Sequence, residues 1–178
     1  MAPEPHAPYL PEEHPTARAR SRRRGHRAAV LVTAAVAATA VVGSRGTRPD
    51  SSWFRSLDKP SWYPPKEAFP IAWTALYASI AWAGTRALSR APHGEAAAYA
   101  GALGTNLALN AAWPWSFFAA ERTGRGLATI LALDVSNVCL VRRTARIDGR
   151  AAVALLPYVA WTGFATALTE EIWARNPS

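Results

Sequence analysis

Polar and aromatic side chains recur at helical spacing within one apolar stretch of the chain, residues 96–120. Asn106, Asn110 and Trp113 follow one another at i, i+4 and i+7 and therefore share one face of a helix. An amide in a hydrocarbon environment costs free energy unless it is hydrogen-bonded. Hydrogen bonds between helices and contacts to a bound ligand explain the two amides equally well. Trp113 could also be an anchor at a membrane interface.

A carboxylic acid lies in another apolar stretch, which reads LALDVSNVCLVRR. Asp134 and Asn137 are three residues apart and share a helix face. An acidic side chain at membrane depth indicates a functional site, and the alternative is a protonated or paired Asp that holds two helices together. Because no basic residue lies at a similar depth elsewhere, we expect the partner of Asp134 to be a hydroxyl, an amide or water.

Two further stretches carry aromatic stripes at helical spacing. Trp73 and Tyr77 share a face of the stretch 70–85. Trp161 and Ala165 share a face of the stretch 151–169, with Phe164 beside them. Such a stripe is more often a packing surface than a ligand site. The small Ala165 next to large rings leaves room for a neighbouring helix or for a flat ligand.

Residues for conventional catalysis are missing from these stretches. The histidines, His6, His14, His26 and His93, all lie in the tail or in a loop, and Cys139 has no second cysteine for a disulfide or a metal site. The sequence has no phosphate-binding glycine loop and no Ser/His/Asp grouping. We therefore expect no catalytic residue, no metal site and no required cofactor.

The elements that carry these residues are predicted to be membrane helices. The 178 residues suffice for one domain, and their charges cluster in short blocks between five apolar stretches. A stretch of this kind matches a helix that crosses a hydrocarbon core of about 30 Å. The sequence predicts an all-α bundle of five transmembrane helices over 28–173, with a long ordered first loop, a disordered basic arm at 1–27 and a tail at 174–178. The predicted helices cover 28–44, 69–88, 96–120, 125–144 and 150–173.

Arginine dominates the net charge of +8 and sits beside the apolar stretches. There it meets lipid phosphates, so the charge indicates a lipid bilayer and not a nucleic acid as the partner. The arm and the second and fourth loops hold twelve Arg and Lys residues, against eight on the opposite side. These counts predict a multi-pass protein of the cell membrane with its N-terminus in the cytoplasm and its C-terminus outside.

The basic run RARSRRRGHR, followed by a short apolar stretch, also fits a secretory signal with a loose twin-arginine match. On this segment alone, a cleaved signal and a retained first helix are equally good interpretations. The other four apolar stretches favour retention, because a bundle needs its first helix for packing.

Small residues recur every four positions on the stretch 96–120 and allow another backbone to approach closely. The partner is either a helix of the same bundle or a second copy of the chain. The residues of the predicted dimer face are Ala97, Ala100, Gly101, Gly104 and Ala108.

Three segments together carry a resemblance to a known family. They are WFRSLDKPSWYPPKEAFPIAWTALY, LNAAWPWSFF and LLPYVAWTGFATAL, in this order along the chain. The chain resembles the tryptophan-rich sensory protein and translocator protein family (TspO/MBR, the peripheral-type benzodiazepine receptor family) over residues 28–172. The first segment supplies the most specific motif, L-x-K-P-x-W-x-P-P-x-x-x-F-x-x-x-W-T-x-L-Y.

The resemblance implies a homodimeric five-helix bundle that binds protoporphyrin IX or related tetrapyrroles of the haem pathway, as a transporter or a stress sensor. The loop between the first two predicted helices would cover the cavity, and its prolines limit the freedom that ordering must remove. The ligand-binding residues would be Trp73, Tyr77, Asn110, Trp113, Trp161, Phe164 and Ala165. The lid would consist of Lys59, Pro60, Trp62, Pro64 and Pro65, with Tyr63 on its underside and Lys59 and Lys66 facing the anionic groups.

Two alternative functions remain open at this point. Bound porphyrin could be broken down in a light-dependent reaction that uses a cavity tryptophan, or the chain could be a structural, partner-binding membrane protein without a ligand. Sterol is a further ligand of some relatives. Glu170 and Ala174 stand where the animal sterol-recognition segment has Tyr and Arg, which argues against sterol binding through that segment.

Overall fold

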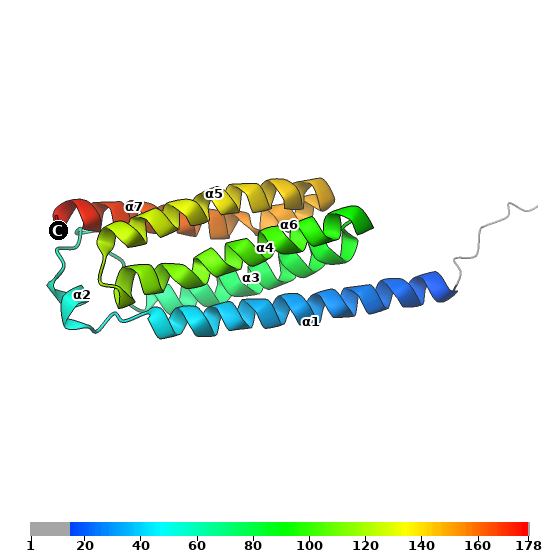
Figure 1. Cartoon of the computed structure of the whole chain (residues 1–178), viewed down its shortest axis with the longest axis horizontal. Coiled ribbons are helices and arrows are strands. Elements are labelled where there is room, and N and C mark those ends of the chain that lie inside the picture. Colours follow the sequence, from blue (N-terminus) through cyan, green and yellow to red (C-terminus); the bar gives the residue numbers. More distant parts are fainter. Residues whose placement is uncertain (1–14, 178) are drawn as a thin grey trace, which may run out of the picture.

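The computed structural model describes residues 15–177, and all regular elements in this range are helical. The predicted all-α fold is therefore confirmed. Long helices lie side by side and a short one, α2, sits in the loop at one end (Figure 1). The elements are α1 (Pro15–Gly46), α2 (Ser52–Ser56), α3 (Ala68–Arg90), α4 (His93–Pro114), the π-helical turn η1 (Trp115–Ala119), α5 (Thr123–Ile147), α6 (Gly149–Ala154) and α7 (Leu156–Arg175).

The long helices begin and end close to the predicted bounds, with one exception. Helix α1 begins at Pro15, so residues 15–27 are helical although they were expected to belong to a disordered arm. This part of α1 extends beyond the ends of its neighbours (Figure 1). The expected disorder of residues 1–14 lies outside the described residues.

Three of the helical segments in the described chain are long and apolar enough to cross a membrane: Ala19–Gly46, Thr123–Ile147 and Gly149–Arg175. Helices α3 and α4 were also expected to cross. Their aromatic and amide groups, such as Trp73 and Tyr77 in α3 and Asn106 and Asn110 in α4, lower the hydropathy of these segments. Length and composition alone therefore identify three membrane-spanning segments, and α3 and α4 are not among them.

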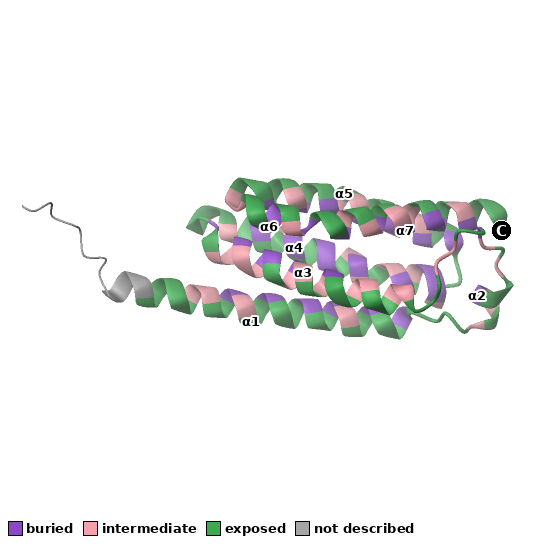
Figure 2. Cartoon of the chain, turned by 180° about the vertical axis from the view of Figure 1, so that it is seen from behind, coloured by how far each residue is buried: buried purple, intermediate pink, exposed green. Residues whose placement is uncertain are grey.

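Buried residues lie on the helix faces that meet inside the bundle, where the ribbon is purple in Figure 2. One apolar cluster joins α1, α3, α4 and α7 through residues such as Val36, Ile80 and Leu107. A second cluster, beneath the α2 loop, is mostly aromatic and contains Phe54 and Phe117. Gly126 of α5 is required here, because a Cβ atom at this position would lie 2.5 Å from the ring of Phe117.

The fifth predicted helix is interrupted two residues before its proline. Helix α6 ends at Ala154, and α7 begins at Leu156 with Pro157 in its first turn. Proline is well accommodated there because the first turn of a helix needs no hydrogen bond from that backbone nitrogen. The interruption agrees with the kink that Pro157 predicts.

Asp148 joins the ends of α3, α5 and α6. Its side chain caps α6 by accepting from the backbone N–H of Ala151, and its carboxylate lies 2.9 Å from Arg86 Nε and 2.5 Å from an Arg90 nitrogen. The hydrogen bond from Ala151, followed by the contacts from Arg86 and Arg90, lowers the pKa of Asp148 to about 2 from an ordinary 3.8. The folded protein therefore prefers the ionised carboxylate.

This lowered pKa predicts a loss of stability in acid. Because the folded-state pKa lies below the unfolded value, the contribution of Asp148 is complete above about pH 4 and falls as the pH decreases toward 2. Thermal unfolding of the protein in detergent should show a lower midpoint for Asp148→Asn at pH 5 and a smaller acid-induced drop than in the wild type. Parallel pH profiles of the two proteins would contradict the prediction.

Candidate ligand-binding site

A chain of buried hydrogen bonds runs across the bundle from α3 through α4 to α7. The Tyr77 hydroxyl donates to Asn110 Oδ1 over 2.9 Å, and Asn110 Nδ2 donates to the Tyr158 hydroxyl over 2.9 Å. Tyr158 in turn donates to Asn106 Oδ1 over 3.1 Å. Tyr158 therefore bonds to both asparagines of α4 at once, and its side chain is 1% exposed.

The same network continues into α5. Asn106 Nδ2 donates to Asn137 Oδ1 over 2.6 Å and to Ser136 Oγ over 3.2 Å. Asn137 Nδ2 then donates to Thr162 Oγ1 of α7 over 2.8 Å. Asn106 is fully buried and both ends of its amide are bonded to other helices. Of the two explanations for the amide face of α4, interhelical hydrogen bonding is the one that the structure shows for Asn106.

A small enclosed cavity lies between this network and the end of the bundle that carries α2, with walls from α3, α4, α5 and α7. Its volume is about 20 Å³, which is room for one water molecule. Five of the predicted ligand-binding residues line it, namely Trp73, Asn110, Trp113, Trp161 and Ala165. The other residues of its wall are Phe69, Ile130, Leu133 and Thr162.

The two remaining predicted ligand-binding residues support the wall. Tyr77 holds Asn110 through its hydroxyl and packs on Trp73 with ring centroids 5.3 Å apart. Phe164 lies 5.6 Å from the ring of Trp161 and 5.8 Å from that of Trp62. Both positions therefore act on the cavity through residues that line it.

Trp113 brings an unpaired donor to the cavity wall. Its indole stacks on Phe117 at 5.6 Å, and its buried Nε1–H has no hydrogen-bond partner among the described residues. A buried polar group without a partner costs free energy, and such groups are rare in native proteins. A ligand acceptor in the cavity would satisfy this donor. Trp115, by contrast, is exposed and donates to the carbonyl of Val42 over 2.9 Å.

Asp134 lies beside the cavity wall and is not part of it. Its Oδ2 accepts from the Thr166 hydroxyl over 2.6 Å, as expected for an acid without a basic partner. Its Oδ1 is buried and has no partner among the residues described. The hydrogen bond between Asp134 and Thr166 joins α5 to α7, one turn away from the bond between Asn137 and Thr162.

The loop predicted to be a lid makes aromatic contacts with residues at and beside the cavity wall. Trp62 packs edge-on against Phe164 of α7, and Tyr63 lies 5.7 Å from Phe69, whose ring contacts Trp161 at 5.9 Å. Pro60 is buried, Pro64 is half-buried and Pro65 is exposed. The underside of the loop is therefore continuous with the aromatic wall of the cavity.

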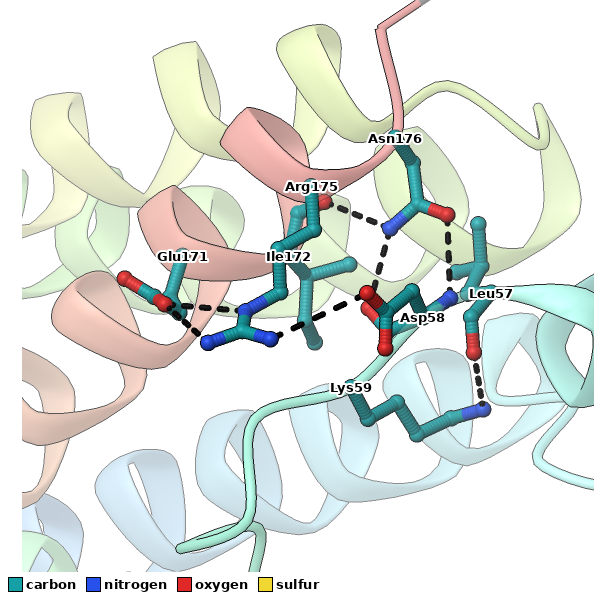
Figure 3. Close-up of polar contacts among 7 residues, drawn as sticks. All are labelled: Leu57, Asp58, Lys59, Glu171, Ile172, Arg175 and Asn176. Atoms are coloured by element: carbon teal, nitrogen blue, oxygen red, sulfur yellow. Dashed lines mark hydrogen bonds and ion pairs between the residues drawn. The ribbon is translucent and has the colours of Figure 1, made fainter.

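The same loop is fastened to the end of α7 (Figure 3). The side-chain amide of Asn176 donates to the carbonyl of Asp58 and accepts from its backbone N–H, both over 3.0 Å. Arg175 lies 3.7 Å from the Asp58 carboxylate and also binds Glu171. We call these contacts of Asp58 with Arg175 and Asn176 the C-terminal clasp.

Lys59 is engaged inside the loop and does not face an open mouth. Its Nζ donates to the Leu57 carbonyl over 3.1 Å and lies 4.6 Å from the ring centre of Phe54. Burial lowers the pKa of Lys59, while the charge of Asp58 opposes this shift. Lys66 and Arg55 are exposed.

The small-residue face of α4 points away from the bundle. Ala97, Ala100, Gly101, Gly104 and Ala108 are all exposed, and a Cβ atom at either glycine would meet nothing within 4 Å. These residues therefore do not serve packing within this chain.

The sequence interpretation missed four residues of the cavity wall and the central position of Tyr158. Ile130 and Leu133 carry no signal that separates them from other apolar residues of α5. Phe69 and Thr162 had a signal available, since Phe69 is itself a residue of the first motif and Thr162 follows Trp161.

Known proteins match this chain over most of its length. A model of the TspO/MBR family matches residues 29–174. Protein CrtK of Rhodobacter capsulatus is 31% identical over 148 residues, which cover 83% of this chain and 89% of that protein. The tryptophan-rich sensory protein of Cereibacter sphaeroides is 33% identical, with 80% and 87% covered. The translocator protein of Homo sapiens is 32% identical, with 76% and 82% covered.

Proposed function

This chain belongs to the TspO/MBR family, and from that premise we propose that it binds a tetrapyrrole such as protoporphyrin IX in the cavity between α3, α4, α5 and α7. The bound tetrapyrrole is either moved across the membrane or sensed. The observation that carries the proposal is the aromatic cavity, whose wall includes Trp113 with a buried indole N–H that has no hydrogen-bond partner in the described part of the chain.

The chemistry of the wall suits a flat, mostly apolar ligand. Trp73, Trp113 and Trp161 offer large π surfaces, and Ala165 leaves space between them. Polar groups are few, and Asn110 and Thr162 already have partners on neighbouring helices. Ligand pockets of this kind use many apolar contacts for affinity and one or two polar contacts for orientation. The N–H of Trp113 is the free donor for that purpose.

The cavity must open before a tetrapyrrole can enter. Sites for ligands of this size have volumes of about 300–1,000 Å³, whereas the cavity here has about 20 Å³. The loop of Trp62 and Tyr63 is the element best placed to move, because it lies over the wall and is joined to α7 by the C-terminal clasp and by the contact of Trp62 with Phe164. We therefore assign the structure to the closed state of the proposed binding cycle.

The anionic propionates of the ligand would lie at the mouth. Exposed Arg55 and Lys66 can pair with them directly. Lys59 becomes available when the loop lifts away from Phe54.

A side-by-side titration tests this function. The full chain in lipid nanodiscs is titrated with protoporphyrin IX, haem and a sterol, and tryptophan fluorescence is recorded. We expect saturable quenching by protoporphyrin IX at micromolar concentrations. If neither protoporphyrin IX nor haem quenches the fluorescence, the proposal is refuted. If only the sterol binds saturably, the ligand is a sterol and not a tetrapyrrole.

The C-terminal clasp predicts the kinetics of binding. Asn176→Ala removes both hydrogen bonds to the Asp58 backbone. If each contributes about 1 kcal/mol, the loss of about 2 kcal/mol lets the lid open roughly thirtyfold more often, so association and dissociation of protoporphyrin IX both accelerate by roughly this factor. Stopped-flow fluorescence measures the rates, with Glu170→Ala, an exposed neighbour on α7, as the control. Unchanged rates in Asn176→Ala would show that the clasp does not hold the lid.

The arrangement in the membrane is part of the proposal. All five long helical rods cross the cell membrane, α3 and α4 with their polar groups turned inward, and the basic arm remains in the cytoplasm.

Two copies associate through the exposed small-residue face of α4, where backbones can approach closely. Gly104→Leu should then reduce the dimer fraction in detergent, measured by light scattering.

A further inference from the structure

A second hollow lies on the outside of the bundle, between α1 and α3. Thr33 of α1 and Ala81, Trp82, Thr85 and Arg86 of α3 line an open groove of about 290 Å³. Trp82 is 49% exposed. The groove shares no residue with the aromatic cavity. It is mostly apolar along its length and has a cation at the end near the basic arm.

The groove lies near the boundary between the basic run and the apolar part of α1. Ala28 follows the basic run, and Thr33 is five residues further along α1, about 8 Å deeper in the apolar part at 1.5 Å per residue. On α3, Trp82 precedes Arg86 by one helical turn, and the guanidinium lies 5.3 Å from the centre of the Trp82 ring. The apolar part therefore faces acyl chains, and the cationic end faces phosphates.

Positive charge surrounds the end of the groove and is only partly compensated. Arg86 and Arg90 share a single carboxylate, that of Asp148, which leaves one net positive charge. Arg24 of α1 donates to the carbonyl groups of Leu88 and Ala91 at the end of α3.

Helix α1 carries further basic groups on the face that holds Thr33. At 100° per residue, its Arg22 and His26 lie within about 40° of Thr33 on the helix surface. Both side chains are exposed. The end of the groove therefore lies between two basic helix faces.

We propose that this groove binds an anionic phospholipid from the leaflet on the side of the basic arm. One acyl chain lies against Ala81 and Trp82, and the phosphate lies at Arg86 with Arg90 and the basic face of α1 around it. Basic pockets between membrane helices on the cytoplasmic side suit such head groups. An uncharged lipid would leave the charge of the arginines unmatched. The site is separate from the tetrapyrrole cavity, so either assignment can fail without the other.

Brominated lipids, whose acyl chains quench a tryptophan in contact with them, test the proposal. The full chain is placed in phosphatidylcholine nanodiscs containing increasing fractions of brominated phosphatidylglycerol or brominated phosphatidylcholine. The signal of Trp82 is obtained as the difference between wild type and Trp82→Phe. We expect phosphatidylglycerol to quench Trp82 half-maximally at a mole fraction at least threefold lower than phosphatidylcholine. Equal quenching by the two lipids would overturn the proposal.

Three variants separate a defined site from general charge attraction. Arg86→Gln should abolish the threefold preference, whereas Arg143→Gln, an exposed arginine at the same end of α5, should keep it. Because Arg86 also holds Asp148, Thr33→Phe provides a variant that fills the groove without touching a charge; it should weaken quenching by both lipids. A preference that survives Arg86→Gln in folded protein, or quenching unchanged by Thr33→Phe, would contradict the site. Inorganic phosphate at millimolar concentration should not compete, since it lacks the acyl chain.

Discussion

Replacement of Asn106 by leucine is expected to cause the largest loss of stability among the predicted variants, about 2–4 kcal/mol in the free energy of unfolding. Leucine has a similar size but leaves the Tyr158 hydroxyl, the Asn137 carbonyl oxygen and the Ser136 hydroxyl without the partner they now share. Tyr158 and Asn137 are fully buried, so neither water nor lipid can replace their bonds, whereas Ser136 is half-buried. The loss should therefore exceed that of a single hydrogen bond.

Unfolding in mixed micelles of increasing SDS content, followed by circular dichroism, measures this effect. Thr105→Val is the matched control, because Thr105 is the preceding residue of α4 and its side chain is exposed. Its effect should stay within about 0.5 kcal/mol. A loss in Asn106→Leu no larger than that of the control would show that the buried network does not stabilise the bundle.

Ala165→Phe is expected to produce the largest change in ligand binding, a decrease of at least tenfold in affinity for protoporphyrin IX. Ala165 is buried in the cavity wall, and a cavity of about 20 Å³ cannot hold a phenyl ring without displacing its neighbours. Overpacking of this kind costs about 1–3 kcal/mol of stability, and the new ring occupies the space that the ligand needs. The decrease in affinity for protoporphyrin IX should therefore be more pronounced than the loss of folding stability.

Fluorescence titration measures the affinity, and the SDS titration verifies that the variant folds. Ala167→Phe makes the same chemical change two residues further along α7 on an exposed position, so it should bind as the wild type does. If Ala165→Phe bound protoporphyrin IX with wild-type affinity, the ligand would lie elsewhere on the protein.

The sequence predicts features that depend on neighbours within one helix. The spacing of Asn106, Asn110 and Trp113 placed them on one face, and the structure turns this face inward. Pro157 likewise predicts the break before α7, because a proline excludes a hydrogen bond within its own segment. These inferences hold because 3.6-residue periodicity and proline geometry are local properties.

Features that depend on contacts between distant segments could not be predicted. Asn176 gives no local sign that it pairs with the backbone of Asp58, 118 residues earlier in the chain. Lys59 was expected at an anion-facing rim, but it lies over Phe54 because the loop folds back onto its own helix α2. Tyr158 lies about one turn before Trp161 in the sequence, which does not show that it joins Asn106 and Asn110.

The volume of the cavity is likewise invisible in the sequence. The pattern of tryptophans around Ala165 is compatible with an open pocket and with a closed one. The structure shows a closed wall because the lid rings of Trp62 and Tyr63 pack onto Phe164 and Phe69. Side-chain packing of this kind depends on the whole fold.

Locking the lid tests the central claim, that a tetrapyrrole enters the aromatic cavity beneath the loop. In the native protein, the side chain of Asn176 contacts the backbone of Asp58. The test variant combines Asp58→Cys and Asn176→Cys with Cys139→Ser, because Cys139 is free and exposed. A short, reducible, thiol-specific crosslinker then joins the lid to α7. The uptake of protoporphyrin IX is followed by stopped-flow fluorescence before crosslinking, after it and after reduction. We predict that uptake slows at least tenfold in the locked protein and recovers when the crosslink is cleaved. Uptake at the same rate and to the same extent in the locked protein would contradict the account.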